Sequence, residues 1–139
     1  MNAFGIWKFF GKVLKNETSG DYLNEASAIV EKIDVELGIE RHKSGDVVFV
    51  DVRDSADIAS TGTIAGALKI PRGFIEFAAD ELSTFHNKAL SKEQEIILVC
   101  GAGGMAALTG KTMIEMGYKN IKNVGGIGDW IKAKGPIEK

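Results

Sequence analysis

Two short runs of the sequence are apolar at every position, and together with a third, weaker run they limit the folds open to this chain more than any other feature. Residues 47–50 and 96–99 are rich in β-branched side chains, and residues 121–124 repeat the pattern more weakly. A strand with one face in water alternates apolar and polar residues, whereas a continuous apolar run indicates a strand covered on both faces. These runs therefore predict a buried, parallel sheet, to which residues 66–70, just before Pro71, add a short strand.

Helical periodicity occupies the stretches around these runs. Apolar residues recur at helical spacing in residues 23–33, and Asp34 is placed to cap a second short helix over residues 35–41. Similar patterns cover residues 73–81 and 105–116. Strands that alternate with helices predict an α/β fold, a mainly parallel twisted sheet with helices on both faces. Ligands of such folds bind at the carboxyl ends of the strands.

Bulk properties exclude several classes of protein. The chain has 139 residues, the length of one ordinary domain. Its net charge of −2 argues against nucleic acid as a partner. A single cysteine cannot form an internal disulfide, which favours a reducing, cytoplasmic location. His42 and His86 are isolated on polar segments and are expected at the surface, so the sequence predicts no metal site and no cofactor.

The first residues form a separate unit in the sequence. We expect an amphipathic extension over residues 1–20 and a domain over residues 21–139. Within residues 4–14, aromatic side chains fall at helical spacing and lysines lie on another face. A helix packed on its own domain or on a second copy is the simplest interpretation. A membrane-surface helix and a partner-binding segment remain open.

The loop after residues 96–99 is the strongest functional signal. Cys100 stands at the end of a predicted buried strand, and Gly101, Gly103 and Gly104 follow before a helix begins near Met105. Glycines let the chain curl so that main-chain N–H groups converge, and a helix N-terminus adds unpaired N–H groups. A thiol over such a cradle is stabilised as the reactive thiolate. We therefore expect a partly exposed sulfur at the base of a shallow pocket, although a buried structural cysteine followed by a turn is the alternative.

The same glycines match a dinucleotide-binding pattern, which the rest of the chain does not support. Gly101, Gly103 and Ala106 fit G-x-G-x-x-A between a strand and a helix. Such a site needs an acidic residue at the end of the next strand, but the next apolar run ends in glycine. The chain after Cys100 is also too short for the remainder of a dinucleotide-binding unit.

The loop resembles that of a known family, the rhodaneses, whose active loop has the form C-x-x-G-x-R. Cys100 and Gly103 stand in register with that pattern. Four further segments resemble rhodanese motifs in the same order: D-V-R at 51–53 with Asp57, G-T-I-A-G-A at 62–67, P-R-G at 71–73 with Phe77, and G-G-I at 125–127 with Trp130. The resemblance covers about residues 34–139, and it departs from the family at Thr63 and Ala65.

The resemblance implies a sulfurtransferase. In such enzymes a cysteine thiolate takes the outer sulfur from a small donor such as thiosulfate, carries it as a persulfide, and passes it to a thiol acceptor or cyanide. Carried over to this chain, Cys100 would be the catalytic residue. The residues implied around the substrate are Gly101, Ala102, Gly103, Gly104, Met105, Asp51, Arg53 and Arg72.

The loop departs from the family at its charged positions. Rhodanese loops usually close with arginine, and this chain has Met105 there. One hydrogen bond to a charged group contributes about 1.5–3 kcal/mol, so the dianion thiosulfate should bind weakly unless Arg72 or Lys69 reaches the loop. The binding of an organic persulfide should be weakened less, because such a donor carries less charge at its reacting end. The related phosphatase loops need one more residue and a closing arginine, so phosphatase activity is not expected.

Two functions remain open from sequence: a sulfurtransferase or persulfide carrier, and a non-catalytic rhodanese-fold binding or regulatory module. Elsewhere in the site region, we expect an ion pair between Arg53 and Asp57 to brace the turn after residues 47–50. We expect Trp130, Phe74 and Phe77 in the core.

Overall fold

The computed structural model describes residues 16–139. The expectations for the amphipathic segment at residues 4–14 lie outside these residues. The domain boundary expected at residue 21 stays a prediction, and the first described helix begins slightly earlier, at Ser19.

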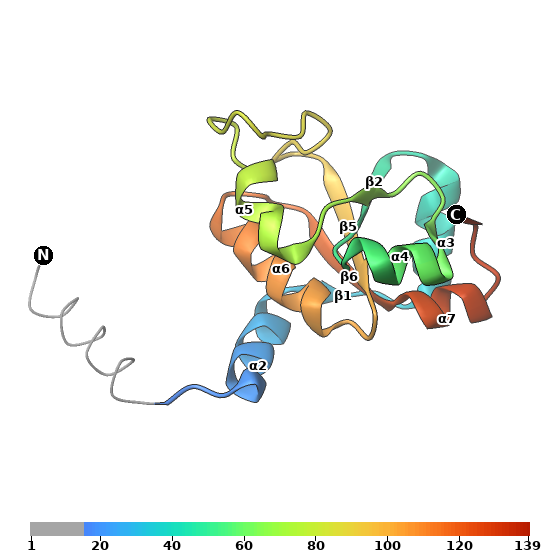
Figure 1. Cartoon of the computed structure of the whole chain (residues 1–139), viewed down its shortest axis with the longest axis horizontal. Coiled ribbons are helices and arrows are strands. Elements are labelled where there is room, and N and C mark those ends of the chain that lie inside the picture. The colour runs from blue at the N-terminus through green and yellow to red at the C-terminus, as the bar shows by residue number, and fades with distance from the viewer. Residues whose placement is uncertain (1–15) are drawn as a thin grey trace, which may run out of the picture.

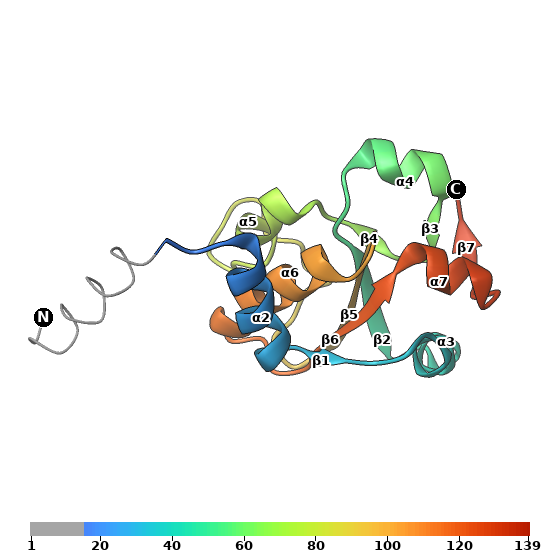
Figure 2. The ribbon, with the colours of Figure 1, turned by 90° about the horizontal axis from the view of Figure 1, so that it is seen from below.

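A five-stranded parallel sheet forms the centre of the structure, with the strand order β1-β6-β5-β2-β4 (Figures 1 and 2). The mainly parallel sheet predicted from the apolar runs is confirmed. A separate antiparallel pair joins β3 to β7. The strands are β1 (Glu31–Lys32), β2 (Val47–Asp51), β3 (Thr63–Ile64), β4 (Leu68–Lys69), β5 (Glu95–Cys100), β6 (Ile121–Gly126) and β7 (Ile137–Glu138).

Helices cover both faces of this sheet, as the pattern predicts. Helices α2, α5 and α6 lie on one side, and α3 and α7 on the other (Figure 2). Thr18 and Asp21 form a capping box at the start of α2, and the Asp34 side chain caps α3 as expected. The bounds are α2 (Ser19–Ile29), α3 (Val35–Ser44), α4 (Ser55–Thr61), η1 (Arg72–Phe74), α5 (Ile75–Ala78), α6 (Gly104–Glu115) and α7 (Ile127–Lys132).

Side-chain alternation along β5 divides the core into two layers. Ile96, Leu98 and Cys100 belong to the layer that also holds buried residues of α5 and α6. Ile97 and Val99 belong to the layer under α7. Because successive side chains of a strand point to opposite faces, this parity directs the Cys100 side chain toward α6.

Of the three aromatic residues expected in the core, only Trp130 lies there. Trp130 is completely buried, but Phe74 and Phe77 are 38% and 52% exposed. Helix α5 has a single turn, and the residues that it buries are Ile75 and Ala78. Phe77 therefore lies on the solvent side of that turn, and Phe74 is the last residue of η1, just before it.

The histidines are less exposed than the sequence indicates. His42 is partly buried, its ring centroid lies 5.3 Å from that of Phe49 and 5.9 Å from that of Trp130, and Nε2 donates to the Ala65 carbonyl at 2.8 Å. His86 is also partly buried and donates to a main-chain carbonyl. The prediction of two surface histidines holds only in part, because the rings of Phe49 and Trp130 pack against His42.

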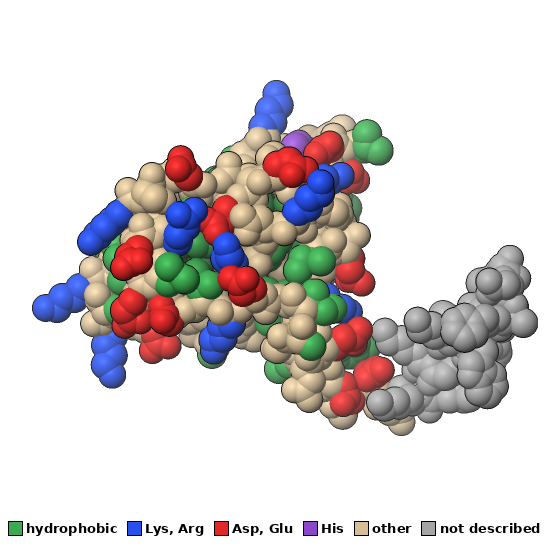
Figure 3. Space-filling view, turned by 180° about the vertical axis from the view of Figure 1, so that it is seen from behind, with side chains coloured by type: hydrophobic (Ala, Val, Ile, Leu, Met, Phe, Trp, Pro, Cys, Tyr) green, Lys and Arg blue, Asp and Glu red, His purple; other side chains and the backbone are tan. Residues whose placement is uncertain are grey.

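The surface drawn in Figure 3 carries acidic and basic side chains side by side. No area of that face gathers the continuous positive charge with which proteins bind a phosphate backbone. Within residues 16–139, no helix is both long and apolar enough to cross a membrane.

An ion cluster braces the end of β5 that lies farthest from Cys100. Glu95 is 8% exposed and accepts hydrogen bonds from Arg41, whose Nε lies 2.9 Å from Oε1, and from Lys122. Burial alone would raise the pKa of Glu95, but the hydrogen bonds from Lys122 and Arg41 outweigh it and leave the pKa below its ordinary value.

This cluster predicts a pH-dependent stability. Because folding lowers the pKa of Glu95, its contribution is fully present above the ordinary glutamate pKa and is lost as the pH falls through the lowered value. Glu95→Gln should lower the free energy of unfolding at neutral pH by about 1–3 kcal/mol, a loss that shrinks in acid. Urea unfolding at neutral pH and at about pH 3 measures it.

Glu93→Gln provides the matched control. Glu93 pairs with Lys119, but both side chains are more than 70% exposed, so the loss should be near zero at either pH. An equal cost for the two substitutions would contradict the role given to Glu95.

Candidate active site

The candidate site lies at the carboxyl edge of the sheet, where the chain leaves β5. Cys100 is the last residue of β5, and α6 begins at Gly104. The parallel register places Asp51 of β2 opposite Val99 of β5 and also opposite Lys69 of β4. The segments that follow β2, β4 and β5 therefore meet at this edge, which explains why motifs far apart in sequence share one region.

Two main-chain N–H groups point at the cysteine sulfur. The amide of Gly103 donates to Sγ at 3.0 Å, and the amide of Ala106, in the first turn of α6, donates at 3.3 Å. Gly103 has a φ of +98°, a backbone conformation that residues other than glycine rarely adopt. This conformation turns the loop around the sulfur. Hydrogen bonds of this kind stabilise negative charge on sulfur. The converging amides expected from sequence are present.

The expected partial exposure of Cys100 is wrong. The residue is 2% exposed and packs in the apolar layer with Val52 and Ala106. The physical reason is the parity of β5, which directs the side chain between the sheet and α6. The sulfur therefore lies beneath the loop.

Strand β6 holds the loop from behind. A Cβ at Gly126 would lie 2.3 Å from the carbonyl oxygen of Gly101, so these two backbones touch. The Asn123 side chain donates to the Gly103 carbonyl at 3.0 Å and accepts from the Gly125 amide at 2.8 Å. Asn123 thus connects the strand to the residue whose amide faces the sulfur.

Asn123 is a site residue that was not predicted from the sequence. It belongs to no motif, but it is a polar residue in a largely buried strand and is 6% exposed. Buried polar side chains need hydrogen-bond partners, so its position was the available signal.

Arg53 makes an ion pair with Asp51, and not with the Asp57 carboxylate as expected. The Arg53 Nη2 lies 2.8 Å from Asp51 Oδ2, and Nε lies 3.0 Å from Oδ1. Asp57 contributes only its main-chain carbonyl, at 3.4 Å from Nη1. The hydrogen bond with Asp51 raises the pKa of Arg53, against the effect of burial. Asp51 is the last residue of β2 and Arg53 follows it by two positions, so their side chains lie on the same face and can meet.

This ion pair is almost closed to solvent. Asp51 is completely buried, and its Oδ2 also accepts a hydrogen bond from Thr63. Arg53 is 4% exposed and donates further to Thr61 Oγ1 and the Gly62 carbonyl, both at 2.9 Å. Both side chains are therefore fully engaged in joining β2 to α4 and β3.

Two clefts meet at Met105. The first, of about 460 Å³, is lined by polar residues of α4, by Arg53, by Gly101 and by Met105, and we name it the polar cleft. The second, also about 460 Å³, is lined by Tyr22 and Leu23 of α2 and by Gly104, Met105 and Leu108 of α6, with Ser19 and Arg72 at its sides; we name it the apolar cleft. Met105 separates the two.

The other two cations near the site lie outside the loop. Arg72 faces the apolar cleft, where its Nη2 donates to Thr112 Oγ1 at 3.2 Å and Nη1 lies 3.5 Å from Glu76. Lys69 lines a different cleft, shared with Arg53. Arg72 and Lys69 are the two cations that the sequence offers for binding thiosulfate at the loop. Of these, Arg72 shares a cleft with Met105.

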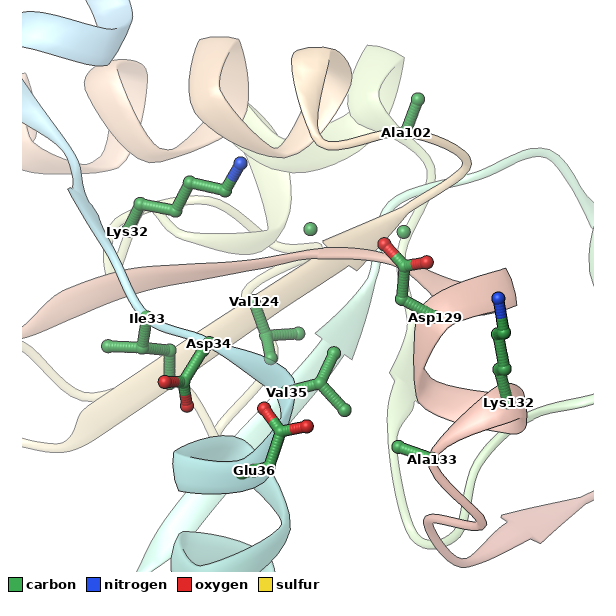
Figure 4. A pocket seen from close by; sticks show the side chains of 12 residues that line it. Lys32, Ile33, Asp34, Val35, Glu36, Ala102, Val124, Asp129, Lys132 and Ala133 are labelled. Carbon is green, nitrogen blue, oxygen red and sulfur yellow. The ribbon is translucent and has the colours of Figure 1, made fainter.

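A fourth cleft, of about 530 Å³, lies on the α3 and α7 side of the sheet (Figure 4). Ala102 stands at its rim, and it is lined by charges of both signs, including Lys32, Asp129 and Lys132. The Cys100 side chain points to the opposite face of the sheet, so this cleft does not lead to the sulfur.

A family model and a curated relative both match most of this chain. Residues 35–133 match the model of the rhodanese-like domain. The "Putative sulfur carrier protein YrkF" of Bacillus subtilis is 26% identical over 124 residues, which are 86% of this chain and 62% of that protein. The chain thus spans less than two thirds of that relative's length.

Two solved structures extend the comparison. A protein of unknown function from Rhodopseudomonas palustris, described as a "Possible Tyrosine Phosphatase", is 35% identical with a TM-score of 0.84 and covers 89% of this chain and 96% of its own. The polysulfide-sulfur transferase of Wolinella succinogenes is 24% identical with a TM-score of 0.67, covers 84% of this chain and 83% of its own, and shows the shared fold. With the family model matched over most of the sheet and its helices, the chain belongs to the rhodanese-like domain family.

Proposed function

We propose that this protein is a sulfurtransferase or sulfane-sulfur carrier that forms a persulfide on Cys100. The observation that carries the proposal is the sulfur at the end of β5, which accepts hydrogen bonds from the Gly103 and Ala106 amides in a loop of the rhodanese type. The description of the Bacillus subtilis relative as a sulfur carrier supports the same chemistry.

The reaction needs no cofactor to balance. The Cys100 thiolate attacks the outer sulfur of a donor R–S–SH, a new S–S bond forms, and the donor's S–S bond breaks. Its electron pair leaves with the inner sulfur as R–S⁻, and the protein holds Cys–S–SH. An acceptor thiolate then attacks the outer sulfur, which regenerates the Cys100 thiolate and releases the acceptor persulfide. The attack follows the ordinary logic of an activated nucleophile.

The surrounding residues have distinct roles in this proposal. The main chain from Gly101 to Ala106, Ala102 and Gly104 included, forms the cradle for negative charge on sulfur. Asp51 and Arg53 are positioning residues, because each is buried and fully hydrogen-bonded. The donor reaches the loop through the polar cleft, since Gly101 and Met105 both line it.

The absence of a cation in the loop determines the donor. Thiosulfate carries two negative charges, and the loop offers them only main-chain N–H groups, so uptake from thiosulfate is weak. A persulfide on an organic thiol carries less charge at the reacting end and is the better donor. A phosphate ester would meet the same deficit, because residues 100–106 include no arginine to bind it bidentately.

Mass spectrometry of the intact full chain tests the proposal. After incubation with an organic persulfide the protein should gain the mass of one sulfur atom, and a thiol acceptor should remove it. Uptake from thiosulfate should be slower. If no donor loads Cys100, the sulfurtransferase hypothesis is wrong and the protein is a non-catalytic binding or regulatory module. The burial of Cys100 and the arginine-free loop are the observations that favour that second function.

Asn123→Ala should slow sulfur loading about five-fold, because a hydrogen bond worth about 1 kcal/mol no longer fixes the Gly103 carbonyl. Loading rates measured by stopped incubation and mass spectrometry give the value. Asn120→Ala, which lies just before the start of β6 and away from the loop, is the control and should load at the normal rate. A normal rate in Asn123→Ala as well would show that β6 does not position the loop.

A further inference from the structure

Helix α2 packs directly against the start of the active loop's helix. The Leu23 side chain lies 3.3 Å from the point where a Cβ on Gly104 would stand, and Val30 approaches the corresponding point on Gly110 at 2.9 Å. Glu25 and Lys111 add an ion pair at 3.0 Å. The glycines of α6 therefore allow α2 to lie close beside the loop.

This helix lies outside the residues that match the family model, which begin at residue 35. It contributes one wall of the apolar cleft through Tyr22 and Leu23, while Met105 and Leu108 contribute the opposite wall. The cleft adjoins the proposed site, because Gly104 and Met105 of the active loop line it and the polar cleft lies on the other side of Met105.

The lining of the apolar cleft has a definite chemistry. Among its described residues, Arg72 is the only charged side chain, and 31% of that side chain remains exposed. Its contact with Glu76, at 3.5 Å, is long for an ion pair and leaves donors available. An apolar wall beside a single guanidinium fits a molecule that carries an apolar group and one carboxylate.

We infer that the apolar cleft binds the organic part of the sulfur donor, and that this donor is a low-molecular-weight persulfide with an apolar substituent and a carboxylate. The inference rests on the proposed function. The sulfur end of the donor lies over the loop, its apolar group lies between Tyr22 and Met105, and its carboxylate meets Arg72. When the S–S bond breaks, the cleft holds the leaving thiolate R–S⁻.

The test compares three synthetic donors on the full chain, with loading of Cys100 followed by intact mass. They are the hydropersulfides of 4-(mercaptomethyl)benzoate, of benzyl thiol and of 2-mercaptoethanol. The first has both recognised groups, the second lacks the carboxylate, and the third lacks both. We expect kcat/KM to fall in that order, by about ten-fold or more between first and last.

Three substitutions locate the effect. Tyr22→Ser should lower loading from both aromatic donors about five-fold relative to the mercaptoethanol donor, because it removes an apolar wall. Arg72→Gln should lower the ratio of the carboxylated to the benzyl donor about ten-fold. Ile29→Ser, on α2 but outside the cleft and 46% exposed, is the control and should change no ratio.

The outcomes separate this inference from the proposed function. Loading that occurs at equal rates from all three donors, or ratios unchanged in Tyr22→Ser and Arg72→Gln, would overturn the cleft and leave sulfur transfer intact. The same change in Ile29→Ser as in Tyr22→Ser would also overturn it, by showing a general effect of α2. Failure of every donor to load Cys100 would overturn the proposed function itself.

Discussion

Cys100→Ser should abolish sulfur loading from every donor. The protein has no other thiol, and a serine hydroxyl at the end of β5 cannot form a persulfide. The two amides that face Sγ would then face a hydroxyl oxygen, so the cradle should survive without its nucleophile. Intact mass after incubation with persulfide and with thiosulfate measures the result, and the expected rate is that of the blank.

The fold must be intact for that result to count. Cys100 is buried in an apolar layer, so placing a hydroxyl there costs stability, and Cys100→Ala serves as the second variant. Both variants should show the circular dichroism of the unchanged protein. Sulfur bound to either folded variant would locate the chemistry elsewhere and refute the role of Cys100.

Met105→Arg should raise kcat/KM for thiosulfate by about ten-fold or more. Residue 105 lines the polar cleft and stands where the family loop usually closes with arginine. One hydrogen bond from a guanidinium contributes about 1.5–3 kcal/mol. The opposing cost of a cation in the first turn of α6 is about 0.3–1 kcal/mol, so the gain outweighs it. A cyanide-coupled assay with thiosulfate measures the change.

Met105→Leu is the matched control for charge. It keeps an apolar side chain of similar size between the two clefts, and its rate with thiosulfate should equal that of the unchanged protein. Rapid thiosulfate turnover by the unchanged protein would contradict the argument, and Arg72 would then be the cation to test. The organic persulfide should gain little from the new arginine.

Local patterns predicted the central strands and the cap of α3 correctly, whereas the helical pattern expected over residues 23–33 ends at Ile29, and Glu31–Lys32 form β1. The apolar runs at 47–50 and 96–99 became β2 and β5, the weaker run at 121–124 became the start of β6, and Asp34 caps α3. The alternation of strands and helices is sufficient for an α/β fold. The helix predicted over residues 73–81 is shorter, because η1 and α5 together end at Ala78.

Predictions about side-chain partners were less successful. Arg53 pairs with Asp51, and His42 packs between Phe49 and Trp130 rather than facing solvent. Spacing in the sequence indicates which side chains can meet, but more than one partner can satisfy it. For Arg53, both Asp51 and Asp57 were within reach. The choice among them depends on which side chain the rest of the fold covers.

The sequence by itself determined the central strands β2, β5 and β6, the α/β class, the family resemblance and the place of Cys100 at a strand end, because the patterns that indicate them lie within a few positions of one another. Tertiary structure decided that Cys100 is buried, that Asn123 fixes the loop and that α2 forms a wall beside Met105. Each of these contacts joins segments 20 or more residues apart, and sequence periodicity carries no record of how two such segments pack. Burial and hydrogen bonding are properties of the assembled layers, so only the folded chain could supply them.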